Sequence, residues 1–248
     1  MNTTSPVRRV QRVRHDLKRR ELRVARVEPL GPHFVAVTLA GDGLADFASD
    51  GFDDHVKLIF AGDGSAEAVR RDYTPRRFDR ARRELTIEFD LHGRGPAASW
   101  ARHAAVGQTL VVGGPRGSMV VPVDYDWHLL AGDGSALPAV RRRLEELPAG
   151  ARAIVLLEVP DQADRVPLES AADVELHWVA SPDAWLAALR AQALPEGEGY
   201  AWCAGEASVM AEARRVLVDE KGHPKEAMRV AAYWKHGKAD HHEELGGD

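Results

Sequence analysis

Residues 127–147 read WHLLAGDGSALPAVRRRLEEL and combine three elements of an α/β fold in one short stretch. Trp127–Ala131 is a short apolar run, and the glycine-containing turn Gly132–Ser135 follows it directly. The residues after the turn predict a helix, because aliphatic side chains recur on one face while arginines and glutamates occupy the other. The aliphatic face consists of Leu137, Val140, Leu144 and Leu147. A strand, a turn and a helix in this order indicate the first unit of a parallel α/β domain.

Strand-like and helix-like segments continue to alternate after this unit. Ala153–Val159 is a continuous apolar run, as expected of a strand that is buried on both faces. Further strands are predicted at Val174–Val179, Tyr200–Ala204 and Arg229–Tyr233, and helices at Asp183–Ala191 and Ser208–Lys221. Because strands that alternate with helices form parallel sheets, we expect an α/β domain over residues 125–240.

The preceding part of the chain, residues 15–124, has a different rhythm of short strands separated by turns. Strands are predicted at Leu22–Glu28, Phe34–Ala40, Val56–Phe60, Arg70–Thr74, Glu84–Leu91 and Thr109–Gly113, with one helix at Pro96–Ala104. Six strands at this spacing indicate a small antiparallel barrel. The sequence therefore predicts a two-domain β plus α/β protein, with a boundary near Val121–Asp126 and no flexible linker.

The composition is that of a globular chain in a reducing compartment. Of the 248 residues, 44% are hydrophobic and 29% are charged, which is enough apolar material for a sizeable core. The sequence contains neither an apolar signal core nor a run of the ~18 apolar residues that a membrane span needs. The single cysteine, Cys203, excludes an internal disulfide and a cysteine-ligated zinc or iron–sulfur site. We expect a cytoplasmic monomer in which Cys203 packs in a strand.

The net charge of -5 is distributed unevenly along the chain. Residues 1–26 carry nine Lys or Arg against two acidic residues, so the rest of the chain is strongly acidic. Such an arm either contacts nucleic acid, acts as a transit peptide or is a solvated lead into the first strand. The acidic body argues against nucleic acid as the main partner, and we predict none.

The string Ala-Gly-Asp-Gly occurs three times, beginning at Ala40, Ala61 and Ala131. The first two copies lie between predicted antiparallel strands and are interpreted as turns. The third opens a helix at the carboxyl end of a parallel strand, where glycines allow close approach and helix N–H groups can face a phosphate. It is neither a Walker motif nor a complete GxGxxG. The string alone is therefore compatible with a nucleotide site and with a helix start built only for packing.

The most informative segment is Arg71-Asp72-Tyr73-Thr74-Pro75-Arg76. Arg71 and Tyr73 share one face of a predicted strand until Pro75 interrupts the ladder. A guanidinium beside an aromatic ring and a hydroxyl suits a ligand that combines phosphates with a flat heterocycle. The alternative is an edge strand whose arginines are solvated.

This segment resembles the Arg-x-Tyr-Ser/Thr signature of the ferredoxin–NADP reductase superfamily, and with its second arginine it is similar to the siderophore-interacting protein family. Four further segments match that family in order: Leu91-His92-Gly93-x-Gly95-Pro96-Ala97-x-x-Trp100-Ala101, Gly132-Asp133-x-x-Ala136-Leu137-Pro138-Ala139, Ala204-Gly205-Glu206 and Tyr233-Trp234-Lys235-x-Gly237. Each motif is weak alone, but five in order over Leu22–Lys238 make a specific resemblance. It implies an antiparallel FAD-binding barrel followed by a parallel-sheet NAD(P)H-binding domain.

The resemblance also implies roles for individual residues around a non-covalently bound FAD. Arg71 is expected at the pyrophosphate, Tyr73 against the isoalloxazine and Thr74 beside the reactive flavin nitrogen, so that Tyr73 and Thr74 are the candidate catalytic residues. The remaining expected flavin contacts are Leu91, His92, Gly95, Pro96 and Ala97, the last three of which would direct a helix N-terminus at the pyrophosphate. Expected on the nicotinamide side are Gly132, Asp133, Ala204, Gly205 and Glu206.

The substrate that the resemblance implies is a ferric siderophore, whose iron is held less tightly after reduction to iron(II). Many such chelates are anionic, so a cationic rim would steer them to the flavin. The candidate cations are Lys235 and Lys238, with Lys57 and Arg76 on the barrel side. Ordinary surface lysines are the alternative interpretation.

The electron donor is left open by the sequence. Glu158, at a predicted strand end, would favour NADH by accepting a ribose hydroxyl, whereas Arg165 would favour NADPH by pairing with its 2′-phosphate. Some members of the family use reduced ferredoxin instead. Whether Trp234 shields the flavin or only packs is open as well. Two other functions are weighed, a general NAD(P)H:flavin or quinone reductase and a siderophore-binding protein without reductase activity.

Histidines and glutamates cluster near the C-terminus, at His236, His241, His242, Glu243 and Glu244. Their spacing offers no preorganised scaffold for an ion, so a mobile tail is the preferred interpretation. The sequence therefore predicts no metal site.

Overall fold

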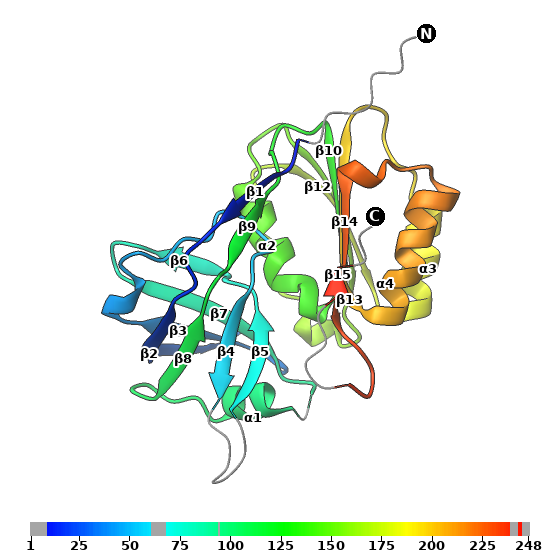
Figure 1. Ribbon diagram of the computed structural model, residues 1–248. Coiled ribbons are helices and arrows are strands. Elements are labelled where there is room, and N and C mark those ends of the chain that lie inside the picture. The colour runs from blue at the N-terminus through cyan, green and yellow to red at the C-terminus, as the bar shows by residue number, and fades with distance from the viewer. Residues whose placement is uncertain (1–8, 61–67, 94, 239–242, 245–248) are drawn as a thin grey trace.

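Two β-sheets lie side by side in the computed structural model of the chain, with a helix between them (Figure 1). The structure describes residues 9–60, 68–93, 95–238 and 243–244. The first sheet is antiparallel and strongly curled, and the second is mainly parallel with helices on both faces. The predicted fold class, an antiparallel barrel followed by a parallel-sheet α/β domain, is thereby confirmed.

The barrel is built from seven strands in the order β5-β4-β8-β2-β3-β7-β6. Their bounds are β2 Arg19–Pro29, β3 Phe34–Ala40, β4 Val56–Phe60, β5 Val69–Tyr73, β6 Arg77–Asp79, β7 Glu84–Asp90 and β8 Thr109–Gly113. Alternate residues such as Val37, Leu58 and Ile87 are fully buried in its interior, and the helix α1 (Pro96–Arg102) closes one end. The edge strands β5 and β6 follow one another directly in the chain. The segment between them, Thr74–Arg76, therefore lies at the open seam of the barrel.

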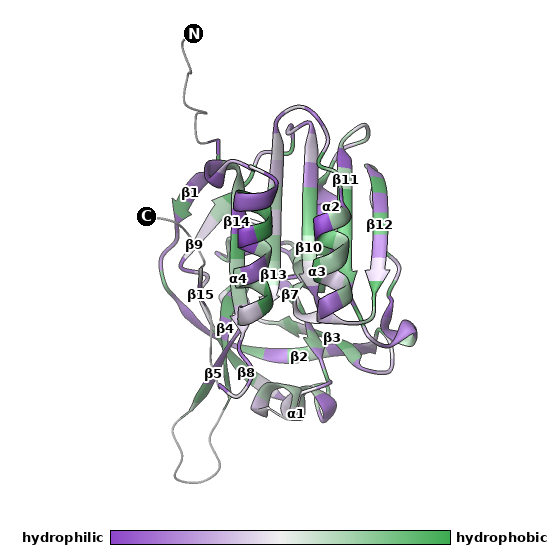
Figure 2. Cartoon of the chain, turned by 90° about the vertical axis from the view of Figure 1, so that its right-hand side faces the viewer, coloured by the Kyte–Doolittle hydropathy of each residue, from purple (hydrophilic) through white to green (hydrophobic). Residues whose placement is uncertain are grey.

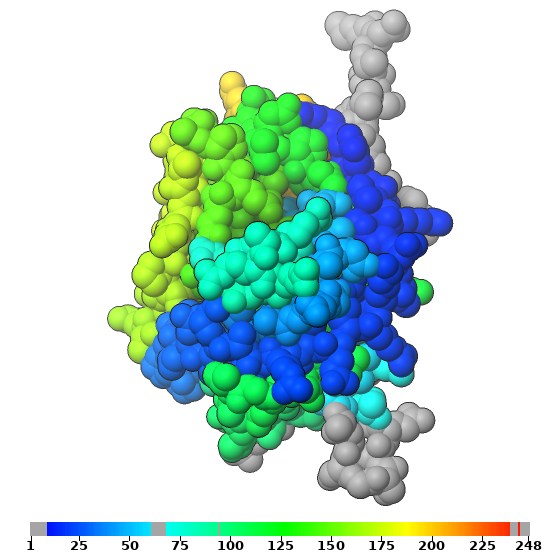
Figure 3. Space-filling view, turned by 90° about the vertical axis from the view of Figure 1, so that its left-hand side faces the viewer, coloured from blue at the N-terminus to red at the C-terminus, as the bar shows by residue number. Residues whose placement is uncertain are grey.

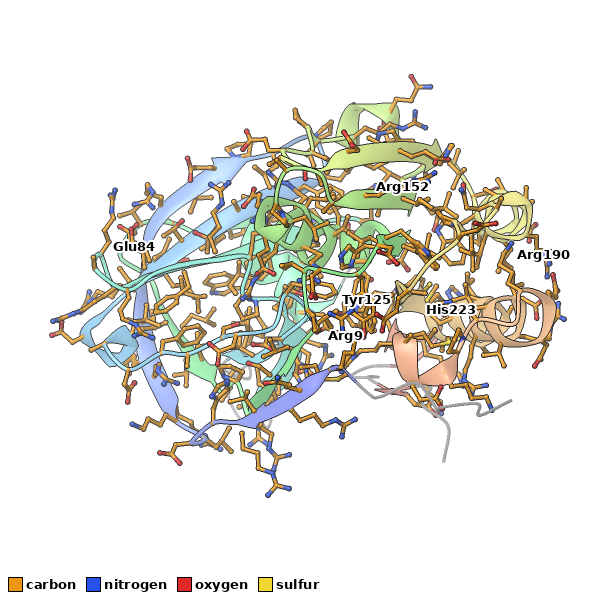
Figure 4. The ribbon with its side chains drawn as sticks, turned by 90° about the horizontal axis from the view of Figure 1, so that it is seen from above. Arg9, Glu84, Tyr125, Arg152, Arg190 and His223 are labelled. Carbon is orange, nitrogen blue, oxygen red and sulfur yellow. The ribbon has the colours of Figure 1, made fainter. Side chains whose placement is uncertain are left out.

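Three strands of the barrel region were not predicted. The strand β6 has only three residues, too few for a recognisable alternation. The strands β1 (Gln11–Arg14) and β9 (Gly117–Val120) form a separate antiparallel ribbon, and every residue of β1 is exposed. The basic arm thus enters the fold at β1, and Arg9 stacks on the Tyr125 ring at 4.5 Å (Figure 4). The third Ala-Gly-Asp-Gly string is described below, whereas the second, at Ala61, falls outside the described residues.

The parallel sheet has the order β12-β11-β10-β13-β14-β15, with only β15 antiparallel. The strand bounds are β10 Trp127–Asp133, β11 Arg152–Glu158, β12 Asp173–Val179, β13 Gly199–Glu206, β14 Met228–Trp234 and β15 Glu243–Glu244. The helix α2 (Leu137–Glu146) lies between this sheet and the barrel, while α3 (Pro182–Ala191) and α4 (Ala207–Arg215) cover the opposite face (Figures 1 and 2). The predicted helix at Ser208–Lys221 is α4 continued by a π-helical turn, Val216–Glu220.

The two halves of the molecule share a core and form one continuous body (Figure 3). Phe34 and Phe52 from the barrel side pack in the same apolar cluster as Leu137 and Val140 of α2. We propose residues 15–124 and 125–240 as the two domains, since β9 ends and β10 begins on either side of that division. None of the helices formed by the described residues is long and apolar enough to span a membrane.

Close packing at Gly132 sets the geometry of the sheet at its carboxyl edge. A Cβ at this position would lie 2.1 Å from the Ala204 carbonyl oxygen of β13 and 2.5 Å from the Ala136 Cβ. Only glycine therefore allows β10, β13 and the turn before α2 to meet so closely. This edge of the sheet faces the seam of the barrel.

Candidate functional site

A cavity of about 760 Å³ lies between the barrel and the carboxyl edge of the parallel sheet. Its size falls within the range of about 300–1,000 Å³ that is usual for ligand and cofactor sites. Seven of the eight barrel residues predicted to contact a flavin line it, namely Arg71, Tyr73, Thr74, His92, Gly95, Pro96 and Ala97. The facing wall includes Ser135 and Pro138 at the start of α2, and Tyr233 and Trp234 of β14. The structure thus brings together residues more than 100 positions apart in the sequence.

The strand β5 supplies the polar part of the barrel wall. Arg71 and Tyr73 lie two residues apart and both line the cavity, as their shared strand face predicts. Within the described residues Arg71 makes no ion pair with a carboxylate, and its Nη1 donates to the Arg70 carbonyl at 2.7 Å. The Tyr73 ring packs on Phe89 with 4.6 Å between ring centroids. Burial raises the pKa of Tyr73 far above its usual value, so its hydroxyl stays protonated and can donate.

Thr74 links the two walls of the cavity. It follows β5 at the barrel seam, is buried, and its side chain is hydrogen-bonded to that of Tyr233. Burial raises the pKa of Tyr233 well above the usual range, so this hydroxyl is protonated too. The contact fixes the rotamer of Thr74 at the point where a flat ligand would meet both domains.

The cavity can hold a flavin dinucleotide, judged by three features of its lining. A Cβ placed on Gly95 would meet no heavy atom within 4 Å, and one on Gly93 would meet its first at 4.0 Å, so a phosphate can approach this backbone. Arg71 supplies a cation, and the rings of Tyr73 and Trp234 supply flat apolar surface. Glu88 lines the cavity with a buried Oε2 that has no hydrogen-bond partner. A buried acceptor of this kind normally has a partner in the protein, in ordered water or in a ligand.

A second cavity, of about 420 Å³, opens at the carboxyl ends of β10, β11 and β13. The chain runs from β10 outward to β11 on one side and resumes at β13 on the other, so this is the switch point where α/β sheets bind dinucleotides. Of the five residues predicted on the nicotinamide side, Gly132, Asp133 and Glu206 line it. Ala204 is instead buried in the core, and Gly205 packs against the Asp133 carboxylate.

Trp234 is the side chain common to both cavities, and Asp133 holds it in place. The Trp234 Nε1–H donates to Asp133 Oδ2 at 2.8 Å, and the Glu206 backbone N–H donates to the same oxygen at 3.0 Å. The other carboxylate oxygen accepts from the Ser135 backbone N–H at 2.9 Å. Burial raises the pKa of Asp133, although these hydrogen bonds act in the opposite direction. Trp234 therefore lines both cavities, in an orientation that these hydrogen bonds support.

Glu206 and Glu158 are two of the carboxylates that line the second cavity, and their surroundings shift their pKa values in opposite directions. Glu206 caps α4, accepting from the Ser208 and Val209 backbone N–H groups at 2.6 and 3.2 Å. Burial alone would raise the pKa of Glu206, but these and other hydrogen bonds outweigh it and the pKa is lowered. Burial raises the pKa of Glu158, with the nearby charges of Asp133 and Asp90 adding to the effect.

Arg165 lies at the same edge of the sheet as Glu158. Its guanidinium is 6.0 Å above the Trp178 ring, and Trp178 pairs with Leu157, the residue before Glu158. Glu158 lines the second cavity, whereas Arg165 stacks on Trp178 and is not part of that lining.

Three further predicted site residues, Leu91, Arg76 and Lys57, are absent from the lining of both cavities. Leu91 is absent from the lining because its side chain packs on the barrel core. Arg76 is only 2% exposed and binds Glu145 of α2 through Nη1 and Nη2 at 2.9 and 2.5 Å. It is therefore a buried link between the domains rather than a cation for a siderophore. Lys57 is outside the lining too, and its Nζ is paired with Asp72 at 2.9 Å.

Lys235 and Lys238 lie in the segment that leaves β14 at the cavity mouth. Both are exposed, and a short antiparallel bridge joins them, with the Lys238 backbone N–H donating to the Lys235 carbonyl at 3.1 Å. Lys238 and Gly237 line the flavin cavity. Of the exposed pair that the sequence singled out, Lys238 thus lines the cavity, and Lys235 is joined to it by the bridge.

Several residues of the two sites escaped sequence reasoning. Glu88 and Asp90 alternate on β7 and both line the first cavity, and the recurrence of polar residues at every second position of the strand ELTIEFD is the signal that could have found them. Cys203 is buried as predicted, and burial raises the pKa of its thiol to about 12. In the C-terminal histidine cluster, His241 and His242 lie outside the described residues. Glu243 and Glu244 form β15 rather than a mobile tail.

Comparison with known proteins agrees with this geometry. The family model described as "Siderophore-interacting FAD-binding domain" matches residues 23–69 and 62–119. The model described as "Siderophore-interacting protein" matches residues 125–237. The two matches together cover both domains.

Curated relatives and a solved structure match over nearly the full chain. The NADPH-dependent ferric-chelate reductase of Escherichia coli is 39% identical, covering 94% of this chain and 99% of that protein. The ferric vibriobactin reductase of Vibrio cholerae is 31% identical, covering 91% and 93%. A crystal structure of a siderophore utilization protein from T. fusca superposes with a TM-score of 0.87 at 34% identity, covering 94% of this chain and 98% of the other. The chain belongs to the siderophore-interacting protein family, with an FAD-binding domain at residues 23–119.

Proposed function

We propose that the protein is an FAD-dependent ferric-siderophore reductase that takes its electrons from NADPH. The observation that carries this proposal is the pair of cavities that meet at Trp234. One has the cation, the aromatic walls and the open glycine backbone that a flavin dinucleotide needs, and the other lies at a dinucleotide switch point. The names of the relatives in E. coli and V. cholerae support the same reaction.

FAD, when bound, supplies a group that can accept a hydride and then give single electrons, so one NADPH reduces two iron(III) chelates to iron(II). The protein has to hold the flavin, admit the donor on one side and the chelate on the other, and exclude water. No protein acid or base is required for electron transfer to iron.

Residues of both domains divide these tasks. Arg71 binds the flavin pyrophosphate, and the backbone at Gly95 accommodates it. Tyr73 and Thr74 contact the flavin ring, and the hydrogen bond between Thr74 and Tyr233 keeps the hydroxyl oriented. Asp133 orients Trp234 where the two cavities meet, so that the nicotinamide would reach the flavin beside the indole ring. Gly132 and Glu206 line the path of the nicotinamide.

The donor is NADPH in this proposal, as the name of the E. coli relative states for that protein. Arg165 at the end of β11 is the side chain suited to its 2′-phosphate, because guanidinium and phosphate pair in a bidentate manner. We further propose that the protein acts as a monomer in the cytoplasm. Reduced ferredoxin is the alternative donor.

Lys235 and Lys238 meet the anionic chelate at the mouth of the flavin cavity. Their exposure and the position of Lys238 in the lining support this role. The structure offers a matched control in Lys225, which is exposed in the short helix before β14, at the opposite end of that strand.

The test is NADPH oxidation coupled to iron(II) formation, followed with a ferrous-specific dye and an anionic ferric siderophore. We expect Lys235→Glu with Lys238→Glu to lower kcat/KM about 10-fold at low salt, with less effect at high salt, while Lys225→Glu changes little. A double variant as fast as the wild type would favour the general flavin or quinone reductase. Tight chelate binding without NADPH oxidation would favour the non-enzymatic binding protein.

A further inference from the structure

Three potential metal ligands meet where the barrel, the α/β domain and the flavin cavity adjoin. His33 lies between β2 and β3, His92 follows β7, and Asp164 belongs to a short 3-10 helix after β11. One ligand atom from each lies within 4.8 Å of the other two. The two imidazole rings are 4.4 Å apart between centroids and tilted by 30°. Neither histidine was connected with Asp164 by the sequence, because the carboxylate comes from the other domain.

The distances in this cluster suit a single shared cation. Asp164 Oδ2 is hydrogen-bonded to His33 Nδ1 at 2.8 Å and lies 3.5 Å from His92 Nε2, so an ion would take the place of the proton between the first two atoms. Two ligand atoms that are each ~2.1 Å from one transition-metal ion are about 3.0 Å apart at a right angle and about 3.4 Å apart at a tetrahedral angle. The observed separations fall around these values, so small side-chain adjustments suffice to admit an ion.

Outer hydrogen bonds already orient the three groups. Asp90 Oδ1 lies 2.7 Å from His92 Nδ1 and also accepts the His92 backbone N–H at 2.8 Å. When His92 Nδ1 donates to Asp90, the other ring nitrogen of neutral His92, Nε2, carries a lone pair that faces the carboxylate of Asp164. These two acceptors repel each other, and a cation bound between them would remove the repulsion. The His33 backbone N–H donates to Asp164 Oδ1 at 2.9 Å and fixes that carboxylate. Carboxylates and backbone groups orient metal-binding histidines in this way.

The charge and exposure of the cluster point in the same direction. The Asp164 side chain is 0% exposed, and both of its ion-pair contacts among the described residues are with imidazoles. A buried carboxylate requires a compensating positive charge. The His33 and His92 side chains are each 42% exposed, so an ion can enter from solvent and retain water ligands.

We infer that His33, His92 and Asp164 form a binding site for a divalent transition-metal ion, and that its occupant is ferrous iron. Two imidazoles and one carboxylate with open positions form a ligand set that suits iron(II). His92 and Asp90 also line the flavin cavity, so the site lies at the edge of the space in which iron(II) would arise. The identity of the ion rests on the proposed function, whereas the site itself does not. Its task is to take up iron(II) as the weakened chelate releases it.

The test is metal binding to the oxidised, FAD-loaded full chain, with Co²⁺ as a spectroscopic probe and Fe²⁺ in anaerobic equilibrium dialysis. We expect one saturable equivalent of each ion, bound at least 10-fold more weakly by His33→Ala and by Asp164→Asn. His177→Ala is the matched control, because His177 is also paired with a carboxylate, Glu175 at 2.9 Å, without a third ligand. This control variant should bind both ions like the wild type.

Two results would overturn the site: no saturable binding by the wild type, or unchanged binding by both cluster variants. Thermal unfolding of metal-free protein shows whether a variant is folded, and the wild type should gain a metal-dependent rise in Tm that the cluster variants lose. Because these measurements need neither NADPH nor a siderophore, they separate the two proposals. If the protein is an active reductase but binds no metal, only the proposed metal site is contradicted. If it binds metal but has no reductase activity, only the proposed reaction is contradicted.

Discussion

The two cavities share the Trp234 side chain but differ sharply in charge. The flavin cavity combines Arg71 and Lys238 with carboxylates and with apolar ring surfaces. The second cavity is lined by four carboxylates, Asp133, Glu158, Asp183 and Glu206, and no Lys or Arg is among its described lining residues. Trp234 thus lies between a site lined by two cations and three carboxylates and a site lined by four carboxylates.

This difference matches the different residence times that the two ligands need. A flavin that stays bound benefits from a cation at its phosphates, and Arg71 provides one on a fixed strand. A donor that must leave after each hydride transfer gains nothing from tight binding. Acidic side chains repel the phosphates of a dinucleotide and keep its affinity modest. The comparison predicts that charge changes on the barrel side act on flavin retention, and those on the sheet side act on donor KM.

The largest effect is expected from reversing the cation of the flavin cavity. Arg71→Glu should weaken FAD binding on the order of 100-fold, since it removes charge-assisted hydrogen bonds worth about 2–3 kcal/mol and adds repulsion. FAD titration followed by fluorescence quenching measures this directly. Arg70→Glu is the control, because Arg70 is exposed on the other face of β5. Equal FAD affinity in both variants would contradict the role of Arg71.

A smaller loss is expected when the partition between the cavities is undermined. Asp133→Ala leaves the Ser135 and Glu206 backbone N–H groups and the Trp234 indole without their acceptor. We expect the free energy of unfolding to fall by about 1 kcal/mol, because two half-buried backbone donors and the exposed Trp234 indole lose their acceptor. Urea denaturation gives the value, and Trp234→Phe, which removes only one donor, should cost clearly less. Equal losses in the two variants would show that Asp133 does not organise the wall.

The link between the domains should respond to acid. Burial by itself would raise the pKa of Glu145, but hydrogen bonds from Arg76 and Arg77 outweigh it and lower the pKa to about 2. The unfolded carboxyl has its usual pKa of 4.5, so the folded state binds fewer protons between these values. The stabilisation is therefore complete above about pH 4.5 and is lost as the pH falls toward 2.

Melting temperature measured against pH tests this dependence. Glu145→Gln should lower Tm by roughly 2–4 °C near neutrality, as expected for about 1 kcal/mol, and should flatten the fall in Tm below pH 4.5. Glu146→Gln is the neighbouring control, because the carboxylate of Glu146 contacts only Arg142 and Arg143 of its own helix among its described ion-pair partners. If the Tm of Glu145→Gln fell with pH as steeply as that of the wild type, the ion pairs of Glu145 would not be the cause of the acid dependence.

The smallest effect concerns the choice of donor, which we test at Glu158 in the lining of the acidic cavity and at Arg165 outside it. Arg165→Ala should raise KM for NADPH about 3- to 10-fold and leave KM for NADH nearly unchanged, because only NADPH carries the 2′-phosphate. Glu158→Gln should have the opposite preference, improving NADPH by removing a repulsive charge. Steady-state kinetics measures KM for NADH and for NADPH in each of the two variants. Equal changes in KM for NADH and NADPH in both variants would show that other residues distinguish the two donors.

The contrast between these regions also explains what the sequence could reveal. Features that depend on a local pattern could be predicted. The strands β10 and β11 follow from their apolar runs, and the shared face of Arg71 and Tyr73 follows from the two-residue period of a strand. Arg76 was misplaced because its partner Glu145 is 69 residues away in the other domain. The ribbon of β1 and β9 was missed because β1 is fully exposed and carries no apolar alternation.

The same limit applies to the polar groups of the sites. The Asp133–Trp234 hydrogen bond and the cluster of His33, His92 and Asp164 join residues from distant strands and loops. No local pattern marks such partners, because their proximity results from the docking of the two domains.

The most direct test of the central claim is the visible spectrum of the FAD-loaded protein under anaerobic conditions, with NADPH added first and a ferric siderophore second. We predict that oxidised flavin bands bleach with one equivalent of NADPH and return when two equivalents of the chelate are added, with two iron(II) formed. Bands that bleach but are not restored by the chelate would contradict ferric-siderophore reduction. A protein that takes up no FAD at all would contradict the assignment of the cavity itself.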